Sequence, residues 1–211
     1  MHYVMFDIDG TLVESYELDS ECFINAVKDV TGIGIDSNWS KYQHVTDSGI
    51  LSEIIGLNNI SNAQEVHDEV KKVFIKQLEQ SIKENAFNQV QGASSFLSLL
   101  NSMSNVMVSF ATGGWYESAV LKLKSAGIDF SQMPFASSND HISRIEIMKI
   151  AAARANAGKS SSCTYFGDGS WDKEACQQLG FNFVLVGNKL EHKPSFRDFK
   201  STNEILACIG L

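Results

Sequence analysis

The sequence predicts an α/β protein whose open, twisted parallel sheet is flanked by helices and interrupted by an inserted all-helical block. Short, nearly continuous apolar runs alternate with segments of helical periodicity, which is typical of parallel strands buried on both faces. One long block near the N-terminus breaks this alternation and contains helical patterns only. Strands that alternate with helices imply right-handed crossovers within one sheet.

The strands of the predicted sheet are short. Four apolar runs and one shorter segment are expected to form them: 3–6, 106–110, 163–166, 181–186 and, shorter, 133–136. Helical periodicity flanks the second and third runs, at 93–100, 115–126, 142–157 and 171–179. We expect residues 1–14 and 89–211 to form one α/β core.

Residues 15–88 form the helical block, with helices expected at 17–30, 47–55 and 62–82. The last helix has apolar side chains at a spacing close to 3.6 residues, at Val66, Val70, Val73, Phe74, Leu78 and Ile82. An all-helical block between the first strand and the remaining α/β units indicates an insertion.

The composition is that of an ordinary globular protein. The chain has 211 residues, of which 44% are hydrophobic and 20% charged, far from the disordered regime. A net charge of -8 argues against nucleic acid or an anionic membrane as a partner. No run approaches the length of a membrane span, and the four cysteines show no close pairing. We therefore expect a cytoplasmic protein with reduced thiols.

Polar, acidic and glycine residues gather where three of the predicted strands end. The three stretches are Asp7-Ile8-Asp9-Gly10-Thr11-Leu12, Ala111-Thr112-Gly113-Gly114 and Gly167-Asp168-Gly169-Ser170-Trp171-Asp172. Arg144 begins the helix that precedes the third stretch. Because ligands bind beyond the carboxyl ends of the strands in an open parallel sheet, these residues are expected to meet in one site.

The acids among these residues favour a hard cation. Asp7 and Asp9 are two apart at a strand end and project to the same side, and Asp168 offers a third oxygen donor. Oxygen ligands without histidine or cysteine favour Mg²⁺ over Zn²⁺. The metal and Arg144 together offset the repulsion that an anionic phosphate would otherwise meet. The alternative reading treats both acids as turn formers, which does not explain why several motifs coincide at strand ends.

These motifs resemble those of the haloacid dehalogenase-like hydrolase superfamily. Its first motif, DxDGTL, matches residues 7–12, and its fourth, GDxxxD, matches residues 167–172. Its second motif, a Thr or Ser closing a hydrophobic strand, matches Thr112, and its third, a Lys or Arg before the fourth motif, matches Arg144. The resemblance implies a Rossmann-like core, and it interprets residues 15–88 as a helical cap domain.

The resemblance implies roles for the two acids of the first motif. Asp7 is expected to be the nucleophile, forming an aspartyl phosphate. Asp9 is expected to be the general acid and base, with its backbone carbonyl on the metal. An acid at the Asp9 position indicates phosphate esters, because the dehalogenase and phosphonatase branches of the superfamily lack it.

The other motifs are expected to hold the phosphoryl group and the metal. Thr112 would hydrogen-bond a phosphoryl oxygen, while Arg144 would neutralise phosphoryl charge and steady Asp7. The expected metal set is Asp7, Asp9, Asp168 and Asp172, the last binding directly or through water. Backbone N–H groups are expected to donate to the phosphoryl group at Ile8, Gly113 and Gly114.

Substrate selectivity must come from the cap, where the loop at 42–49 is the main candidate. Thr46 or Asp47 is a natural N-cap for the helix that follows, and either capping alone or substrate contact explains this polar loop. Lys149 is a rival to Arg144, although Arg144 fits the spacing better. Trp115 either lines the cleft or packs a helix, and the basic stretch 189–200 is expected at the surface.

The leading interpretation is a magnesium-dependent phosphatase acting on a small phosphorylated metabolite, as a monomer or small homo-oligomer. A phosphomutase is the alternative within the superfamily, but its usual histidine in the first cap helix is absent from residues 16–22. The alternative from a different class is a non-catalytic regulatory module with an acidic pocket for metal and phosphate. Such modules lack the second acid and the cap that this sequence has.

Overall fold

Six parallel strands form the single sheet of the computed structural model, which describes residues 1–157 and 162–211. The strands are β1 (His2–Phe6), β2 (Val106–Ala111), β3 (Phe135–Ala136), β4 (Ser162–Gly167), β5 (Asn182–Val186) and β6 (Ser195–Phe196). Their order is β3-β2-β1-β4-β5-β6, so the chain leaves β1 toward one edge and later returns to its other side. The five predicted strands are confirmed, and β6 is an addition.

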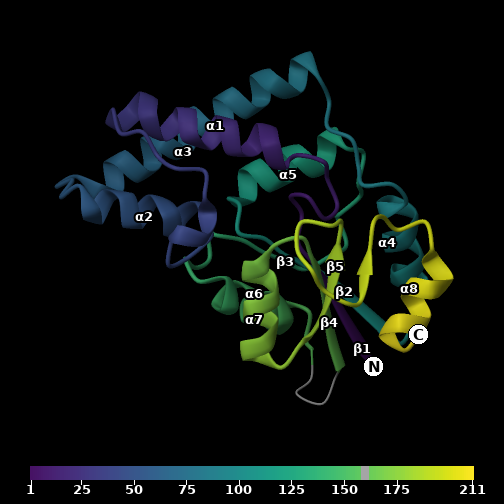
Figure 1. Ribbon diagram of the computed structural model, residues 1–211. Helices are drawn as coiled ribbons and strands as arrows, with labels where there is room; N and C mark the ends of the chain where they lie inside the picture. The colour runs from purple at the N-terminus through teal and green to yellow at the C-terminus, as the bar shows by residue number, and fades with distance from the viewer. Residues whose placement is uncertain (158–161) are drawn as a thin grey trace.

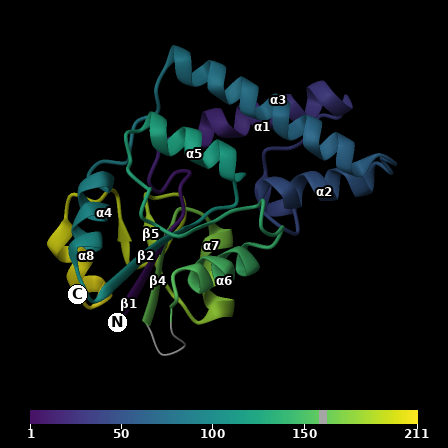
Figure 2. The ribbon, with the colours of Figure 1, turned by 180° about the vertical axis from the view of Figure 1, so that it is seen from behind.

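Helices cover both faces of the sheet (Figures 1 and 2). On one face lie α4 (Ala93–Ser102) and α8 (Thr202–Ile209), and on the other lie α6 (Arg144–Arg154) and α7 (Ser170–Leu179). The remaining core helix, α5 (Tyr116–Ser125), follows β2 and lies toward the helical block. The predicted α/β class with a Rossmann-like sheet is therefore confirmed.

Alternation along β1 explains why its sequence is apolar throughout. Val4 and Phe6 belong to the core on one face of the sheet, whereas Tyr3 and Met5 belong to the core on the other. All four are buried. A central strand with helices on both faces has no solvent side, and so it carries no polar alternation.

The inserted block forms a helical layer beyond the carboxyl ends of the strands (Figure 1). It contains α1 (Tyr16–Thr31), the short 3-10 helix η1 (Trp39–Lys41), α2 (Asp47–Leu57) and α3 (Ala63–Glu84). The three predicted helices are confirmed. The two chain crossings between core and block are hydrogen-bonded to each other, with Glu14 N–H donating to the Asn88 carbonyl at 2.9 Å and Val90 N–H to the Leu12 carbonyl at 2.9 Å.

Residues 189–200 lie mostly at the surface, as expected, but Phe199 is buried in the core. Phe199 is 1% exposed, and its ring stacks on Phe96 with centroids 5.3 Å apart. Phe6 and Phe166 complete this aromatic cluster. No periodic pattern predicts this packing, because a two-residue strand and a short helix are too brief to show one.

None of the described helices is long and apolar enough to cross a membrane. All four cysteines are free thiols, three of them buried.

Replacing Phe199 with Ala should lower the free energy of unfolding by about 3–5 kcal/mol, because the ring is lost from a buried aromatic cluster. Chemical denaturation followed by circular dichroism measures this. Leu57→Ala is the matched control: Leu57 is 73% exposed, and its truncation should change stability by less than about 0.5 kcal/mol. Equal effects of the two substitutions would contradict a structural role for the C-terminal segment.

Candidate active site

The loop after β1 places Asp7 and Asp9 at the centre of the carboxyl edge of the sheet. Asp7 follows β1 directly and its N–H donates to the Phe166 carbonyl of neighbouring β4 at 2.9 Å. Gly10 then turns the chain with a φ of +74°, and a side chain there would collide with Asp168. The loop after β1 therefore contacts the loop after β4, at the point where the strand order reverses.

Three carboxyl groups form a buried acidic cluster at this point. Carboxylate oxygens of Asp7, Asp168 and Asp172 lie within 4.8 Å of one another. Burial, followed by the charge of Asp172, raises the pKa of Asp7 to about 7, and burial raises that of Asp168 to about 6. Asp7 Oδ1 is buried and has no hydrogen-bond partner among the described residues. These buried carboxylate oxygens have little positive charge around them, and oxygen donors of this kind suit a hard divalent cation.

Arg144, the first residue of α6, supplies positive charge to this cluster. Its Nη1 lies 2.9 Å from Asp172 Oδ1 and 3.5 Å from Asp7 Oδ1, and its Nη2 donates to the carbonyl of Val45 in the helical block at 3.1 Å. Burial opposes the charge, but Asp172, Tyr165 and Asp7 together raise the pKa of the guanidinium. Arg144 therefore joins two acids of the core to the inserted block.

Lys149, the rival considered for this role, lies elsewhere. Its ammonium is 2.7 Å from Glu146, and its side chain is 53% exposed. On α6 the two positions are five residues apart, so their side chains project in different directions.

Thr112 and the two glycines after it form the neighbouring wall. Thr112 is 1% exposed and lines the cavity with Gly113 and Gly114. A side chain at Gly113 would collide with the Arg144 guanidinium, so glycine permits the close approach. The N–H of Gly114 donates to Thr112 Oγ1 at 3.2 Å, which holds the threonine hydroxyl. The N–H of Ile8 stabilises the Asp7 carboxylate and lowers its pKa against burial.

A second buried cation, Lys122 of α5, was missed by the sequence analysis. Its ammonium is 0% exposed and lies 2.7 Å from both Asp9 and Asp19. Burial opposes its charge, but the carboxylates of Asp19, Asp9 and Asp47 outweigh burial and raise its pKa. Ser15 Oγ also donates to Asp9 Oδ1 at 2.5 Å. The available signal was a lysine on the apolar stripe of α5, beside Ala119 and Leu123.

Lys189 is exposed, as expected for residues 189–200, but its contacts at the site were missed. It forms an ion pair with Asp168, and its ammonium lies 3.2 Å from the ring centroid of Tyr16, the first residue of α1. The Lys189 ammonium therefore makes both an ion pair with the acidic cluster and a cation–π contact with the inserted block.

Thr46 and Asp47 both lie at the junction of the inserted block with the core. Thr46 is the N-cap of α2, as predicted, accepting from Gly49 N–H at 3.0 Å and donating to the Ile142 carbonyl at 2.7 Å. Asp47 Oδ2 accepts from Trp115 N–H at 2.8 Å. Burial and then the charge of Asp19 raise the pKa of Asp47 to about 8.

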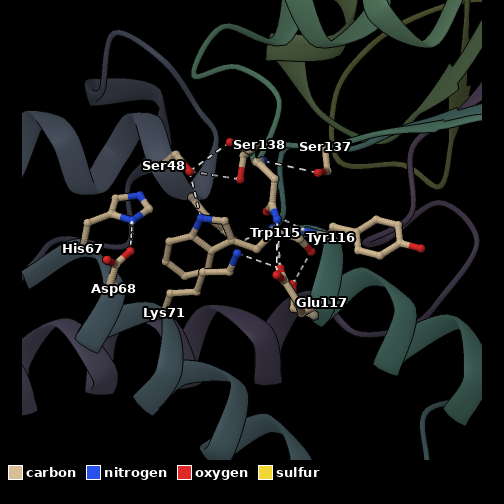
Figure 3. Close-up of polar contacts among 12 residues, drawn as sticks. Ser48, His67, Asp68, Lys71, Trp115, Tyr116, Glu117, Ser137 and Ser138 are labelled. Carbon is tan, nitrogen blue, oxygen red and sulfur yellow. Dashed lines mark hydrogen bonds and ion pairs between the residues drawn. The ribbon is translucent and has the colours of Figure 1, made fainter. Parts of the chain in front are cut away.

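Trp115 docks the inserted block onto the core (Figure 3). The indole is fully buried, and its Nε1 donates to Ser48 Oγ at 2.8 Å, while Ser48 donates to the Ser138 carbonyl at 3.0 Å. Beside it, Lys71 of α3 forms an ion pair with Glu117 of α5 at 2.7 Å. Of the two alternatives for Trp115, the structure therefore supports packing for most of the side-chain surface. The residue directly follows Gly113 and Gly114 in the chain.

A cavity of about 560 Å³, counted with its open mouth, lies between the sheet and the inserted block. Nine of the residues singled out from the sequence line it: Asp7, Asp9, Thr112, Gly113, Gly114, Arg144, Asp168, Thr46 and Asp47. Asp172, in contrast, is 0% exposed and pairs with Arg144. Ile8 is 0% exposed and is not among the residues that line the cavity.

The family model described as haloacid dehalogenase-like hydrolase matches residues 4–186. The chain belongs to this family. A comparison with curated proteins found no match. The match spans the motifs at all three strand ends and the inserted helices, so the helical block of this haloacid dehalogenase-like hydrolase is its cap.

Solved structures share the fold over the whole chain. A β-phosphoglucomutase from Clostridium difficile has a TM-score of 0.76 at 17% identity, covering 100% of this chain and 97% of the other. CbbY from Rhodobacter sphaeroides, in complex with phosphate, has a TM-score of 0.75 at 13% identity and covers 100% of each chain. YfnB from Bacillus subtilis, bound to magnesium, has a TM-score of 0.59 at 12% identity, covering 97% and 98%.

Lys122→Met should destabilise the protein by about 3–5 kcal/mol, because Asp9 and Asp19 are left as uncompensated buried charges. Denaturant unfolding measures the loss. Lys124→Met, at an exposed position of the same helix, should change stability by less than about 0.5 kcal/mol. Adding Asp19→Asn to Lys122→Met should restore part of the loss, since one orphaned charge is removed. Additive losses in the double variant would contradict this pairing.

Proposed function

We propose that this chain is a magnesium-dependent phosphatase that hydrolyses a small-molecule phosphate monoester through an aspartyl phosphate on Asp7. One observation carries the proposal: the two acids of the first motif have different partners. Asp7 faces the cavity with an unbonded oxygen near Arg144, whereas Asp9 is held by Lys122 and Ser15. An acid free to attack beside an acid fixed for proton transfer is the arrangement that a two-step hydrolysis requires.

In the first step, a carboxylate oxygen of Asp7 attacks phosphorus and the bond from phosphorus to the ester oxygen breaks. The leaving alkoxide takes its proton from Asp9. Arg144 and Thr112 bind the phosphoryl oxygens, and the arginine compensates the charge that builds up on them. Lys122 and Ser15 keep the Asp9 carboxyl in one orientation during this transfer.

In the second step, water attacks the phosphorus of the aspartyl phosphate. Asp9, now ionised, accepts the proton of this water, and the bond from phosphorus to Asp7 breaks. Inorganic phosphate and the Asp7 carboxylate are regenerated. Asp9 is thereby returned to the protonated form that the next cycle requires.

The acidic cluster would hold Mg²⁺ through Asp7, Asp168 and the backbone carbonyl of Asp9. Asp172 Oδ2 accepts from Gly169 N–H at 3.0 Å and Oδ1 lies 2.9 Å from Arg144, so Asp172 would contact the metal either directly through Oδ1 or through water. When bound, Mg²⁺ supplies positive charge between the Asp7 carboxylate and the phosphate dianion. The unbonded Asp7 Oδ1 and the raised pKa values of Asp7 and Asp168 support this site.

The cap of the proposed enzyme comprises residues 15–88, with the core in residues 1–14 and 89–211. Segments 13–15 and 88–92 are the only two chain crossings, and they would act as hinges. Closure brings the Val45 carbonyl onto Arg144 and Asp47 onto the Trp115 N–H. Cap position and phosphoryl binding would then be coupled through Arg144.

Asp7→Asn should reduce turnover of p-nitrophenyl phosphate with Mg²⁺ by at least about 10³-fold, because the amide cannot attack phosphorus. Asp68→Asn on the exposed side of α3 is the matched control and should retain wild-type turnover. Phosphate release without any acceptor sugar distinguishes the phosphatase from a mutase. Asp7→Asn turnover above a tenth of the wild-type rate would refute Asp7 as the nucleophile.

Asp9→Ala should slow turnover about 10²- to 10⁴-fold, because the proposed acid and base is lost, and phospho-Asp7 should accumulate. Intact-mass spectrometry after acid quench detects this phosphorylated form.

Arg144→Ala should lower kcat/KM by at least about 10²-fold, since a buried guanidinium beside the phosphoryl site is lost. Lys149→Ala removes a cation from the same helix and should leave kcat/KM within about twofold of wild type, because Lys149 is exposed and pairs with Glu146. Circular dichroism melts separate loss of fold from loss of binding. An equal or larger loss at Lys149 would overturn this assignment.

A further inference from the structure

The cavity between core and cap is lined by two groups of carboxyl side chains. Asp7 and Asp168 lie at the phosphoryl end, and Asp9, Asp19 and Asp47 lie at the cap end. Arg144 is the only basic side chain lining the cavity within the described residues, and it lies at the phosphoryl end, 3.5 Å from Asp7. Lys189 pairs with Asp168 at the same end.

The cap end is short of positive charge. Among the described residues, Lys122 is the only cation in contact with its three carboxyl groups, and it bonds to Asp9 and Asp19. Asp9 and Asp19 share Lys122, whereas Asp47 forms no ion pair with any of the described residues. A ligand that brings a cation would give this half-buried carboxyl group the partner that it lacks.

Asp47 is the carboxyl group placed to meet that ligand. Its Oδ2 accepts from Trp115 N–H at 2.8 Å, which fixes the side chain, while Oδ1 accepts no hydrogen bond from the residues that the structure describes. Asp47 lines the cavity from the first turn of α2, opposite the Asp7 loop.

Aromatic side chains form much of the remaining wall, at Tyr16, Phe23, Trp39 and Trp171. The face of Tyr16 already carries the Lys189 ammonium at 3.2 Å from its centroid. Rings of this kind beside carboxylates attract small ammonium groups through cation–π and Coulomb terms together.

A second anionic group would meet the opposite environment. CbbY, which shares the fold, has been solved in complex with xylulose-(1,5)bisphosphate. In this chain, no basic side chain among the described residues lines the cap end to receive a second phosphate or a carboxylate. A mutase that passes a phosphoryl group from Asp7 to a phosphorylated sugar must also hold a bisphosphate, and so meets the same obstacle.

We propose that the organic part of the substrate carries a positive charge, so that the enzyme hydrolyses the phosphate ester of a small amino alcohol with its ammonium at Asp47. The inference rests on the proposed phosphatase function and names the substrate class of that site. Selection arises at the cap end, while the phosphoryl end treats all monoesters alike.

The test compares esters that differ only in the charge of the group distant from phosphate: phosphoethanolamine, 2-hydroxyethyl phosphate and phosphoglycolate. kcat/KM should be highest for phosphoethanolamine, at least about tenfold above 2-hydroxyethyl phosphate, and lowest for phosphoglycolate. Asp47→Asn keeps the acceptor for Trp115 N–H but removes the carboxylate charge. It should lower the ratio of kcat/KM for phosphoethanolamine to that for 2-hydroxyethyl phosphate at least tenfold. Asp68→Asn, the matched cap control, should keep the wild-type order.

Turnover of p-nitrophenyl phosphate, run alongside, reports on the phosphatase function itself. Its absence would reject that function, whereas its presence with phosphoglycolate or the hydroxyethyl ester preferred would overturn only the substrate class. Calorimetric titration of the three esters into Asp7→Asn with Mg²⁺ gives the same ranking as binding constants, independent of turnover. Equal binding of all three esters, or an ammonium preference unchanged in Asp47→Asn, also overturns the proposal.

Discussion

The contact on which the rest of the site depends is the buried guanidinium of Arg144. Asp7 and Asp172 are two carboxyl groups held close together away from water, and Arg144 is the protein cation that balances them. Without it their repulsion would favour protonation or rearrangement of the loops. Because the same side chain bonds to the Val45 carbonyl, the charge balance of the core also depends on where the cap lies.

A second cation organises the opposite end of the cavity. Lys122 reaches from α5 to Asp9 in the core and Asp19 in the cap, so one buried ammonium orients the proposed acid–base group and ties it to α1. Trp115 adds the apolar part of the same junction through Ser48 and Asp47. Charge balance and packing thus favour the same closed arrangement, and opening the cap must separate both sets of partners.

Much of the fold could be read from the sequence because its strands are buried on both faces. Continuous apolar runs predicted β1, β2, β4 and β5, and a good helical period predicted α3. The strand β6 and helix α8 escaped prediction because a few residues cannot show a period, and their stability comes from packing. Phe199 is the clearest case, since only its position in three dimensions places it on Phe96.

By itself the sequence determined the family motifs and hence Asp7, Asp9, Thr112, Arg144, Asp168 and Asp172. These residues stand at strand ends, or in the first turn of the helix that follows a strand, and a parallel sheet brings such positions together. Only the tertiary structure decided which charges pair. Lys122, Lys189, Asp19 and Asp47 lie outside the motifs and carry no local signal of their partners. Pairing of buried charges depends on separations in space between distant segments, which spacing along the chain does not contain.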